Sequence, residues 1–274
     1  IMYLVRTVSK YHSSRLVHLL ETWISLVHEH VYYISDTYPT NITRTHVIAT
    51  GTTCGPSSHG VRALCCQTIH DFIFYRRYES QYDWFCHFDD DQYVHTDNLH
   101  EYLSKLDSNY PYYIGRNSWN TKFGRKKNKA YPGDFWFATL GAGVCLSKRT
   151  LHLLEPYTRT VSQFVDGCSR QWYPDDIYLA FILNNHLNIS LTKNLRFHSH
   201  LEGSLFKDKQ EFIDTFHQQI TFGFELRRKI SQYLPNLFPK NIDPLRMRTV
   251  HCLLYTHFKD CQSRIKNNMF NITK

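Results

Sequence analysis

The sequence predicts an α/β fold with a mostly parallel central sheet, and two observations carry this prediction. Short apolar runs typical of buried strands alternate with longer stretches whose apolar side chains recur at helical spacing. The chain is also long enough to bury one large core, since 42% of its 274 residues are hydrophobic and 20% are charged. Parallel strands need helical crossovers between them, so this alternation favours a sheet covered by helices.

The elements of the first half follow from apolar spacing along the chain. The run at residues 2–5 predicts a strand, after which Leu16, Leu19 and Trp23 recur at helical spacing. In order, we expect a strand at 2–5, a helix at 16–27, strands at 31–34 and 47–49, a helix at 61–75, a strand at 84–88 and a helix at 99–106.

The pattern changes past Gly115. Residues 117–133 are polar, basic and poor in periodicity, which is typical of a surface loop. We therefore divide a single domain into two halves, 1–116 and 117–274. In the second half Pro174 precedes a predicted helix, which places Asp175 and Asp176 at a helix N-terminus.

Charge and hydropathy narrow the classes of partner. The net charge of +8 is dispersed, and only residues 125–127 form a tight basic cluster, so the sequence does not favour a nucleic-acid partner. No apolar run approaches the roughly 18 residues of a membrane span, and no signal-peptide pattern opens the sequence. We expect membrane attachment only through an anchor that is absent from this chain.

The eight cysteines favour disulfides over a metal site. They include no CxxC pair, which argues against a zinc ribbon or a thioredoxin-type site. Glycosylation sequons begin at Asn41, Asn188 and Asn271 and indicate the secretory pathway, where disulfides persist.

Three consecutive acids, Asp89, Asp90 and Asp91, end the predicted strand at 84–88. Like charges crowd together only when a positive group offsets them. Strand alternation points Asp89 and Asp91 to the same side, which suits oxygen ligation of Mn²⁺ or Mg²⁺ shared with substrate phosphates. The alternative is a solvated acidic turn, but ligands of α/β proteins bind at the carboxyl ends of strands, which favours a metal site.

Residues 84–94, WFCHFDDDQYV, resemble the aspartate motif of the Fringe glycosyltransferases, relatives of the wider β-1,3-glycosyltransferase family. Six further segments are similar to Fringe segments and occur in the same order: residues 19–25, 135–139, 141–143, 174–176, 197–202 and 251–255. The resemblance therefore covers nearly the whole chain.

The resemblance implies a GT-A-type fold, with a nucleotide-sugar-binding half at 1–116 and an acceptor-binding, catalytic-base half at 117–274. It also implies inverting transfer of N-acetylglucosamine from UDP-N-acetylglucosamine. The implied acceptor is the 3-hydroxyl of O-linked fucose on epidermal-growth-factor-like (EGF-like) repeats of Notch-type receptors. Such an enzyme is expected in the Golgi lumen as a type II membrane protein in full length, or secreted after trimming.

The same resemblance assigns the metal ligands and the base. Asp91 and His200 match the protein ligands of Mn²⁺, although His200 also fits a surface histidine. Inversion in one displacement needs a base for the acceptor hydroxyl and an electrophile at the leaving UDP. Asp176 matches that base and Asp175 a supporting or helix-capping residue, the alternative being that both acids merely cap the helix.

Further substrate contacts are carried over from the matched blocks. Arg15 is suited to grip a phosphate bidentately, or is an exposed helix arginine. Trp136 fits the donor-sugar and acceptor side, or a core aromatic. The expected substrate-binding residues are Thr7, Arg15, Asp36, Asp89, Asp90, Trp136, Gly141, Ala142 and Gly143.

Four departures from the Fringe pattern keep other functions open. Gln67 stands where Fringe proteins have lysine, and the others are Leu140, Gln92 and Ile177. They leave open a related β-1,3-glycosyltransferase with another donor or acceptor. Because Gln67 removes a positive charge near the expected donor site, a catalytically inactive glycoprotein-binding protein of the same fold is the other alternative.

The family pattern, with which local spacing agrees, implies disulfides between Cys54 and Cys66, Cys86 and Cys145, and Cys252 and Cys261. Cys65 and Cys168 are then expected to remain free, although Cys54 has both Cys65 and Cys66 as candidate partners. Of the three bridges, the one between Cys86 and Cys145 closes the longest loop and is expected to stabilise most.

Overall fold

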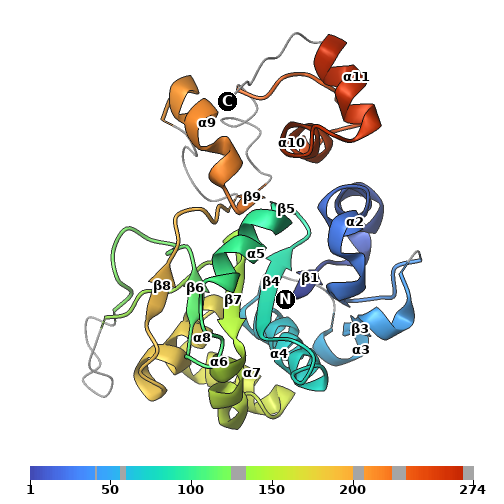
Figure 1. Ribbon diagram of the computed structural model, residues 1–274. Coiled ribbons are helices and arrows are strands. Elements are labelled where there is room, and N and C mark those ends of the chain that lie inside the picture. Colours follow the sequence, from blue (N-terminus) through green and yellow to red (C-terminus); the bar gives the residue numbers. More distant parts are fainter. Residues whose placement is uncertain (41, 56–59, 125–133, 200–206, 224–232, 268–274) are drawn as a thin grey trace.

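A computed structural model describes residues 1–40, 42–55, 60–124, 134–199, 207–223 and 233–267. Figure 1 shows a body built around the central sheet and, beyond β5 and β9, a smaller part that holds α9, α10 and α11. The described strands are β1 Met2–Arg6, β2 Val31–Ser35, β3 Val47–Ala49, β4 Trp84–Asp89, β5 Gln92–Val94, β6 Tyr113–Gly115, β7 Val144–Ser147, β8 Leu191–Lys193 and β9 Thr221–Gly223.

Seven of the described strands form the central sheet, in the order β3-β2-β1-β4-β7-β6-β8. The pairings β3·β2, β2·β1, β1·β4 and β6·β8 are parallel, whereas β7 runs antiparallel to β4 and β6. The predicted α/β class with a mostly parallel sheet is thus confirmed. Strand β5, directly after the three aspartates, pairs antiparallel with β9.

Helices cover both faces of the sheet and form a hydrophobic core with it on each side. Because successive side chains of a strand point to opposite faces, residues of β1 alternate between these two cores. Tyr3 and Val5 pack in the core that includes residues of α2, α5 and α10, while Met2 and Leu4 pack in the core that includes residues of α4, α6, α7 and α8. The described α-helices are α1 Val17–Leu20, α2 Trp23–Val27, α3 Gly51–Cys54, α4 Val61–Arg77, α5 Thr96–Ser104, α6 Lys148–Leu154, α7 Val161–Gln171, α8 Asp175–Phe181, α9 Lys209–Thr215, α10 Met247–Leu254 and α11 Lys259–Asn267.

The helix predicted at 16–27 is broken into separate pieces. A π-helical turn at His12–Leu16 leads into α1, and α2 begins only after Thr22, whose φ of −122° and ψ of −114° are not helical. The Thr22 hydroxyl donates to the carbonyl of His18 at 2.6 Å. This side-chain hydrogen bond competes with the helical backbone pattern, which apolar spacing alone does not reveal.

The disulfide prediction is confirmed for three bridges and wrong for the remaining two cysteines. Cys54–Cys66, Cys86–Cys145 and Cys252–Cys261 are bonded, but Cys65 and Cys168 are also bonded to each other. Cys65 and Cys66 are consecutive on α4 and therefore point in directions about 100° apart. Cys66 meets α3 and Cys65 meets α7, so neighbouring cysteines bind partners on different helices.

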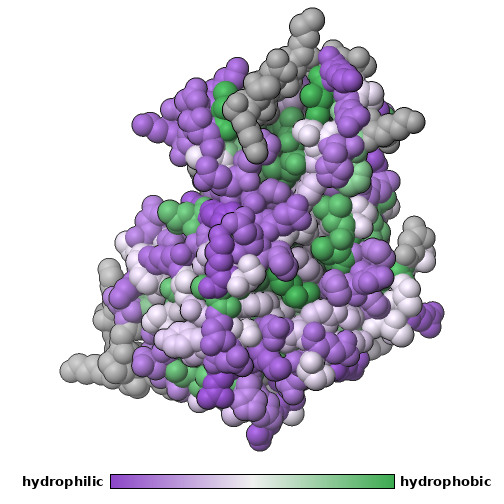
Figure 2. Space-filling view, viewed as in Figure 1, coloured by the Kyte–Doolittle hydropathy of each residue, from purple (hydrophilic) through white to green (hydrophobic). Residues whose placement is uncertain are grey.

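Hydrophilic residues cover much of the face in Figure 2, with hydrophobic residues in small separate groups. The outline narrows between the body and the part that holds α9 to α11. Among the described helices, none combines the length and the apolar character that crossing a bilayer requires.

Candidate active site

A pocket of about 550 Å³ lies where β1, β2 and β4 end. Parallel strands present their carboxyl ends at one edge of a sheet, which gathers side chains distant in sequence. Its charged lining residues are Arg6, Lys10, Arg15, Asp36, Asp89, Asp90, Asp91, Asp175 and Asp176. The remaining lining residues are Thr7, Val8, Tyr11, Leu64, Gln67, Thr139, Leu140 and Gly141. Most of the predicted site residues are therefore brought together.

The aspartate cluster, defined as Asp89, Asp90 and Asp91, is held by different partners at each position. Arg6 Nε donates to Asp89 Oδ1 at 3.2 Å, and Thr7 Oγ1 donates to Asp90 Oδ2 at 2.7 Å. Arg15 Nη1 lies 3.0 Å from Asp90 Oδ1 and 3.3 Å from Asp91 Oδ2. Thr7 and Arg15, both predicted substrate-binding residues, thus support the cluster directly.

These partners set different pKa values within the cluster. Burial raises the pKa of Asp90 to about 6, while Thr7 and Arg15 oppose that rise. Burial, together with the charges of Asp89 and Asp90, raises the pKa of Asp91 to about 7. At Asp89 burial acts in the same direction, but Arg6 and His87 outweigh it and hold the pKa well below its usual range. Asp91 is therefore the member whose charge is least compensated.

Asp175 and Asp176 open α8 and face different surroundings. Asp175 Oδ2 accepts hydrogen bonds from Arg6 Nη1 at 3.1 Å and from Thr68 Oγ1 at 2.6 Å. These contacts with side chains of β1 and α4 fit the supporting role predicted for Asp175. Asp176 Oδ1 accepts from the backbone N–H of Ile177 at 2.7 Å. Burial and the neighbouring charge of Asp175 raise the pKa of Asp176 to about 7.

Sequence reasoning missed Arg6 and the buried pair of His87 and Asp71 beneath the cluster. His87 Nδ1 lies 2.7 Å from Asp71 Oδ2, and its Nε2 lies 3.3 Å from Asp89 Oδ1. Although burial disfavours the charged imidazole, Asp71 and Asp89 raise the pKa of His87 to about 9. The strand-end argument that identified Asp89 applies equally to Arg6, which ends the apolar run of β1. No sequence signal paired His87 with Asp71, because they lie on different elements.

The remaining predicted substrate residues divide into pocket and scaffold positions. Asp36 lines the pocket after β2 and accepts from the backbone N–H and hydroxyl of Ser9 at 2.6 and 2.7 Å. Gly141 lines the pocket, whereas Ala142 is fully buried. Gly143 has a φ of +91°, and a Cβ there would lie 2.8 Å from the Phe88 ring. Only glycine suits that position, which packs against β4.

For Trp136 and Gln67 the sequence left alternative roles open, and their positions relative to the pocket bear on those roles. The described lining residues do not include Trp136, whose ring centroid lies 3.1 Å from Lys193 Nζ in a cation–π contact. Gln67 does line the pocket, from α4, and is only 7% exposed. The predicted loss of a positive charge therefore falls within the pocket.

The second predicted metal ligand, His200, lies outside the described residues. The described segment just before it reaches the aspartate cluster. Gln92, which follows Asp91, donates from Nε2 to the carbonyl of His198 at 3.5 Å, and its Oε1 accepts the backbone N–H of Asp89 at 3.1 Å. The chain thus comes close to the cluster two residues before His200.

The donor set suits a hard divalent cation. Among the described lining residues, six are aspartates and three are lysine or arginine, so full ionisation leaves an excess of three negative charges. Burial is the main cause of the raised pKa values of Asp90, Asp91 and Asp176, and neighbouring carboxylates add to it. Carboxylate oxygens are the ligands that Mg²⁺ and Mn²⁺ favour. Asp91 would be the ligand from the aspartate cluster, with Asp90 beside it.

Comparisons with known proteins identify the family of this chain. The Fringe-like family model matches residues 1–258. A lunatic fringe β-1,3-N-acetylglucosaminyltransferase of Danio rerio is 35% identical over 275 residues, covering 95% of this chain and 70% of the relative. The manic fringe enzyme of the same species is 33% identical over 269 residues, covering 96% and 72%. The Fringe glycosyltransferase of Drosophila melanogaster is 31% identical over 277 residues, covering 95% and 63%. This chain belongs to the Fringe family of glycosyltransferases.

Proposed function

We propose that this chain is an inverting, Mn²⁺-dependent β-1,3-N-acetylglucosaminyltransferase. Its donor is UDP-N-acetylglucosamine, and its acceptor is the 3-hydroxyl of O-linked fucose on EGF-like repeats of Notch-type proteins. It acts in the Golgi lumen as a type II membrane protein. The names of the relatives support the sugar and the linkage.

The observation that carries the proposal is the acid excess of the pocket beside Asp176. A nucleotide diphosphate is itself an anion, so a pocket with six aspartates repels it unless a cation is bound. Asp91 and His200 would hold Mn²⁺, which would supply positive charge to stabilise the leaving diphosphate. Arg15, which contacts Asp90 and Asp91, would orient the same phosphates.

Asp176 has the properties of a general base. A pKa of about 7 gives a carboxylate that is largely ionised just above neutral pH yet basic enough to accept a proton. Its carboxylate takes the proton of the acceptor hydroxyl as the oxygen forms a bond to the sugar anomeric carbon. The bond from that carbon to the diphosphate oxygen breaks on the opposite side, and UDP leaves with the electron pair. The α-linked donor therefore gives a β-linked product.

Gln67 supports two alternatives. A neutral amide in the pocket in place of a cation fits a different donor, such as UDP-galactose, or another acceptor. It also fits a catalytically inactive glycoprotein-binding protein of the same fold, in which donor affinity is lost. The proposed metal ligand Asp91 and the proposed base Asp176 are both present despite Gln67. Their presence favours an enzyme over an inactive binding protein.

The test is a screen of donors against acceptors. Purified protein is incubated with UDP-N-acetylglucosamine, UDP-galactose or UDP-glucose, with and without Mn²⁺, and with a fucosylated or an unmodified EGF-like repeat. We expect transfer only from UDP-N-acetylglucosamine, only to the fucosylated repeat and only with Mn²⁺. Transfer from another donor favours the related enzyme, and acceptor binding without transfer from any donor favours the binding protein.

A further inference from the structure

We propose that Arg6 is a positioning residue that fixes Asp175, and with it the neighbouring base, at a set place relative to the aspartate cluster. The inference rests on the proposed function only for the role of Asp176. It concerns a residue of β1 that contributes no chemistry to the displacement but contacts both Asp89 of the aspartate cluster and Asp175, the neighbour of the base.

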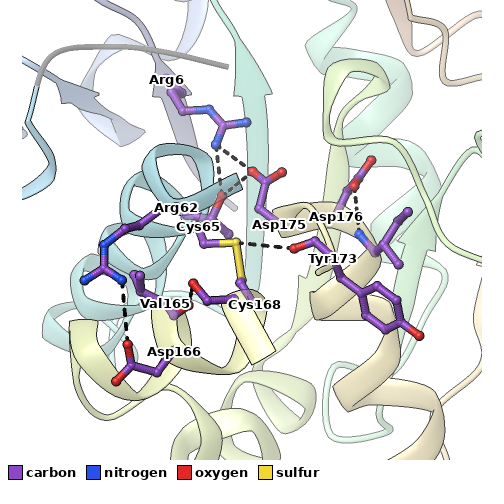
Figure 3. Close-up of a disulfide and its surroundings, with 12 residues drawn as sticks. Arg6, Arg62, Cys65, Val165, Asp166, Cys168, Tyr173, Asp175 and Asp176 are labelled. Carbon is purple, nitrogen blue, oxygen red and sulfur yellow. Dashed lines mark hydrogen bonds and ion pairs between the residues drawn. A yellow bond between two sulfur atoms is a disulfide. The ribbon is translucent and has the colours of Figure 1, made fainter. Parts of the chain in front are cut away.

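The contacts of Arg6 join two separate elements. Its Nε donates to Asp89 at the end of β4, and its Nη1 donates to Asp175 at the start of α8. Figure 3 shows the guanidinium directed toward Asp175, with Asp175 lying between Arg6 and Asp176. A single planar group therefore bridges the aspartate cluster and the first turn of α8.

Thr68 of α4 completes the arrangement around Asp175. The same Arg6 Nη1 lies 2.9 Å from Thr68 Oγ1, which in turn donates to Asp175 Oδ2 at 2.6 Å. Asp175 is held on one oxygen by two donors from different elements, which leaves its carboxylate little rotational freedom. Because Asp176 is the next residue along the helix, its position follows from that of Asp175.

The residue type suits this role. The side chains of Arg6 and Asp175 are 11% and 7% exposed, so the ion pair has little solvent screening. Guanidinium presents its N–H groups in a fixed plane, whereas the ammonium of lysine is a compact point charge. Only the planar group offers Nε to Asp89 and Nη1 to Asp175 in one defined geometry.

The first experiment replaces the charge with Arg6→Gln. The pKa of Asp176 depends on the charges of Asp175 on its own helix and of Arg6 on β1, and the charge of Asp176 in turn raises the pKa of Tyr113 on β6. Because Arg6 lowers the pKa of Asp176, we expect the pKa to rise in the variant. Displacing a reacting group by about 1 Å costs on the order of 100-fold, and we expect a loss of kcat of about that size.

The second variant, Arg6→Lys, keeps the charge and loses the planar geometry, and it decides the question if Arg6→Gln does not fold. We expect the pKa of Asp176 to stay near its wild-type value while kcat falls by about tenfold, since position alone is disturbed. Full kcat in Arg6→Lys contradicts the inference, because geometry would then not matter.

Arg76→Gln is the matched control. Arg76 is a half-buried arginine of α4 that bonds Thr158 and does not line the pocket among the described residues. It should lower thermal stability without changing the pKa of Asp176. If Arg6→Gln behaves in the same way, Arg6 is merely structural.

The readout does not depend on turnover. The pKa of Asp176 is measured by ¹³C NMR of aspartate-labelled protein, with Asp176→Asn identifying the resonance. If the wild-type protein transfers no sugar, the proposed function fails, yet a higher Asp176 pKa in Arg6→Gln than in Arg76→Gln still supports the coupling. An unchanged pKa in Arg6→Gln overturns the inference even if the enzyme is active.

Discussion

Asp175 and Asp176 are adjacent in sequence but accept hydrogen bonds from different kinds of donor. Asp175 accepts from a buried arginine and from a threonine hydroxyl, whereas Asp176 accepts from a backbone N–H. This division fits the proposal that Asp175 is a structural acid and Asp176 is the base. Asp175 is fixed by side chains of β1 and α4, whereas Asp176 lines the pocket with a pKa raised to about 7 by burial and by Asp175.

Activity should follow the ionisation of Asp176. A base must be deprotonated to act, so kcat/KM should rise with pH and reach half its plateau near pH 7, the pKa of this group. The measurement is a pH profile from 5 to 9 in the presence of Mn²⁺. A profile that stays flat down to pH 5 contradicts the assignment of Asp176 as base.

Replacing the base should affect chemistry and spare binding. We expect Asp176→Asn to lower kcat by roughly 10²- to 10⁴-fold, the usual contribution of a general base, with little change in UDP affinity. Asp166→Asn is the control, because Asp166 is an exposed acid of α7 whose side chain is 53% accessible. A fall in UDP affinity equal to the fall in rate would point to a binding role for Asp176.

Metal dependence should centre on Asp91. We expect titration calorimetry to detect tight UDP binding only when Mn²⁺ is present, because the acid excess of the pocket otherwise repels the diphosphate. Asp91→Asn should lose this dependence, whereas Asp166→Asn should keep it. Equal UDP affinity with and without Mn²⁺ in the wild-type protein would contradict the metal site.

The disulfide between Cys65 and Cys168 should stabilise the fold more than the short bridges. It closes a loop with a sequence separation of 103, against 12 for Cys54–Cys66 and 9 for Cys252–Cys261. On the chain-entropy model these loops correspond to about 4.7 kcal/mol for the long one and roughly 3 for each short one. We therefore expect Cys65→Ser with Cys168→Ser to lower the free energy of unfolding more than Cys252→Ser with Cys261→Ser.

Peptide mapping without reduction checks the pairing itself. A Cys65 peptide linked to Cys54 would contradict the arrangement in which α4 is bonded to α3 and α7 through consecutive residues. Figure 3 shows the Cys65–Cys168 bridge beneath the segment that leads to Asp175, with Cys65 Sγ 3.9 Å from the carbonyl oxygen of Tyr173. Its loss should therefore also lower kcat.

The free energy of unfolding should fall at alkaline pH, because His87 then loses its proton. Its folded pKa of about 9 lies above its unfolded value near 6.5, so its contribution is complete below about pH 6.5 and is lost as pH rises through 9. The shift corresponds to a contribution on the order of 3 kcal/mol. Denaturant unfolding of His87→Gln should show a flatter pH dependence over this range, whereas exposed His152→Gln should match the wild type. A wild-type stability that is constant from pH 6.5 to 9.5 would contradict a charged His87.

The sequence predicted what depends on local pattern and on the end of a strand. Asp89, Asp90 and Asp91 were found because an apolar strand precedes them, and Asp36 lies at the end of a second parallel strand. Parallel strands bring their ends to one edge, so the pocket followed from the elements. The resemblance to Fringe proteins then identified Asp176, whose local sequence alone fits a helix N-terminus equally well.

Contacts between distant elements were beyond sequence reasoning. Arg6 reaches both β4 and α8, and His87 is paired with Asp71 of α4, and no local spacing encodes either contact. The Cys65–Cys168 bridge escaped prediction for the same reason, because it depends on the packing of α7 against α4. Local pattern identifies the side chains that carry charge, while tertiary packing decides which of them compensate one another.

The most direct measurement is the structure of the product. The protein is incubated with Mn²⁺, UDP-N-acetylglucosamine and an EGF-like repeat that carries O-linked fucose, and the product is examined by mass spectrometry and NMR. We predict one added N-acetylhexosamine, β-linked to the 3-hydroxyl of fucose, in the wild type and in Asp166→Asn but not in Asp176→Asn. An α-linked product, or equal product from Asp176→Asn, would contradict an inverting transfer driven by this base.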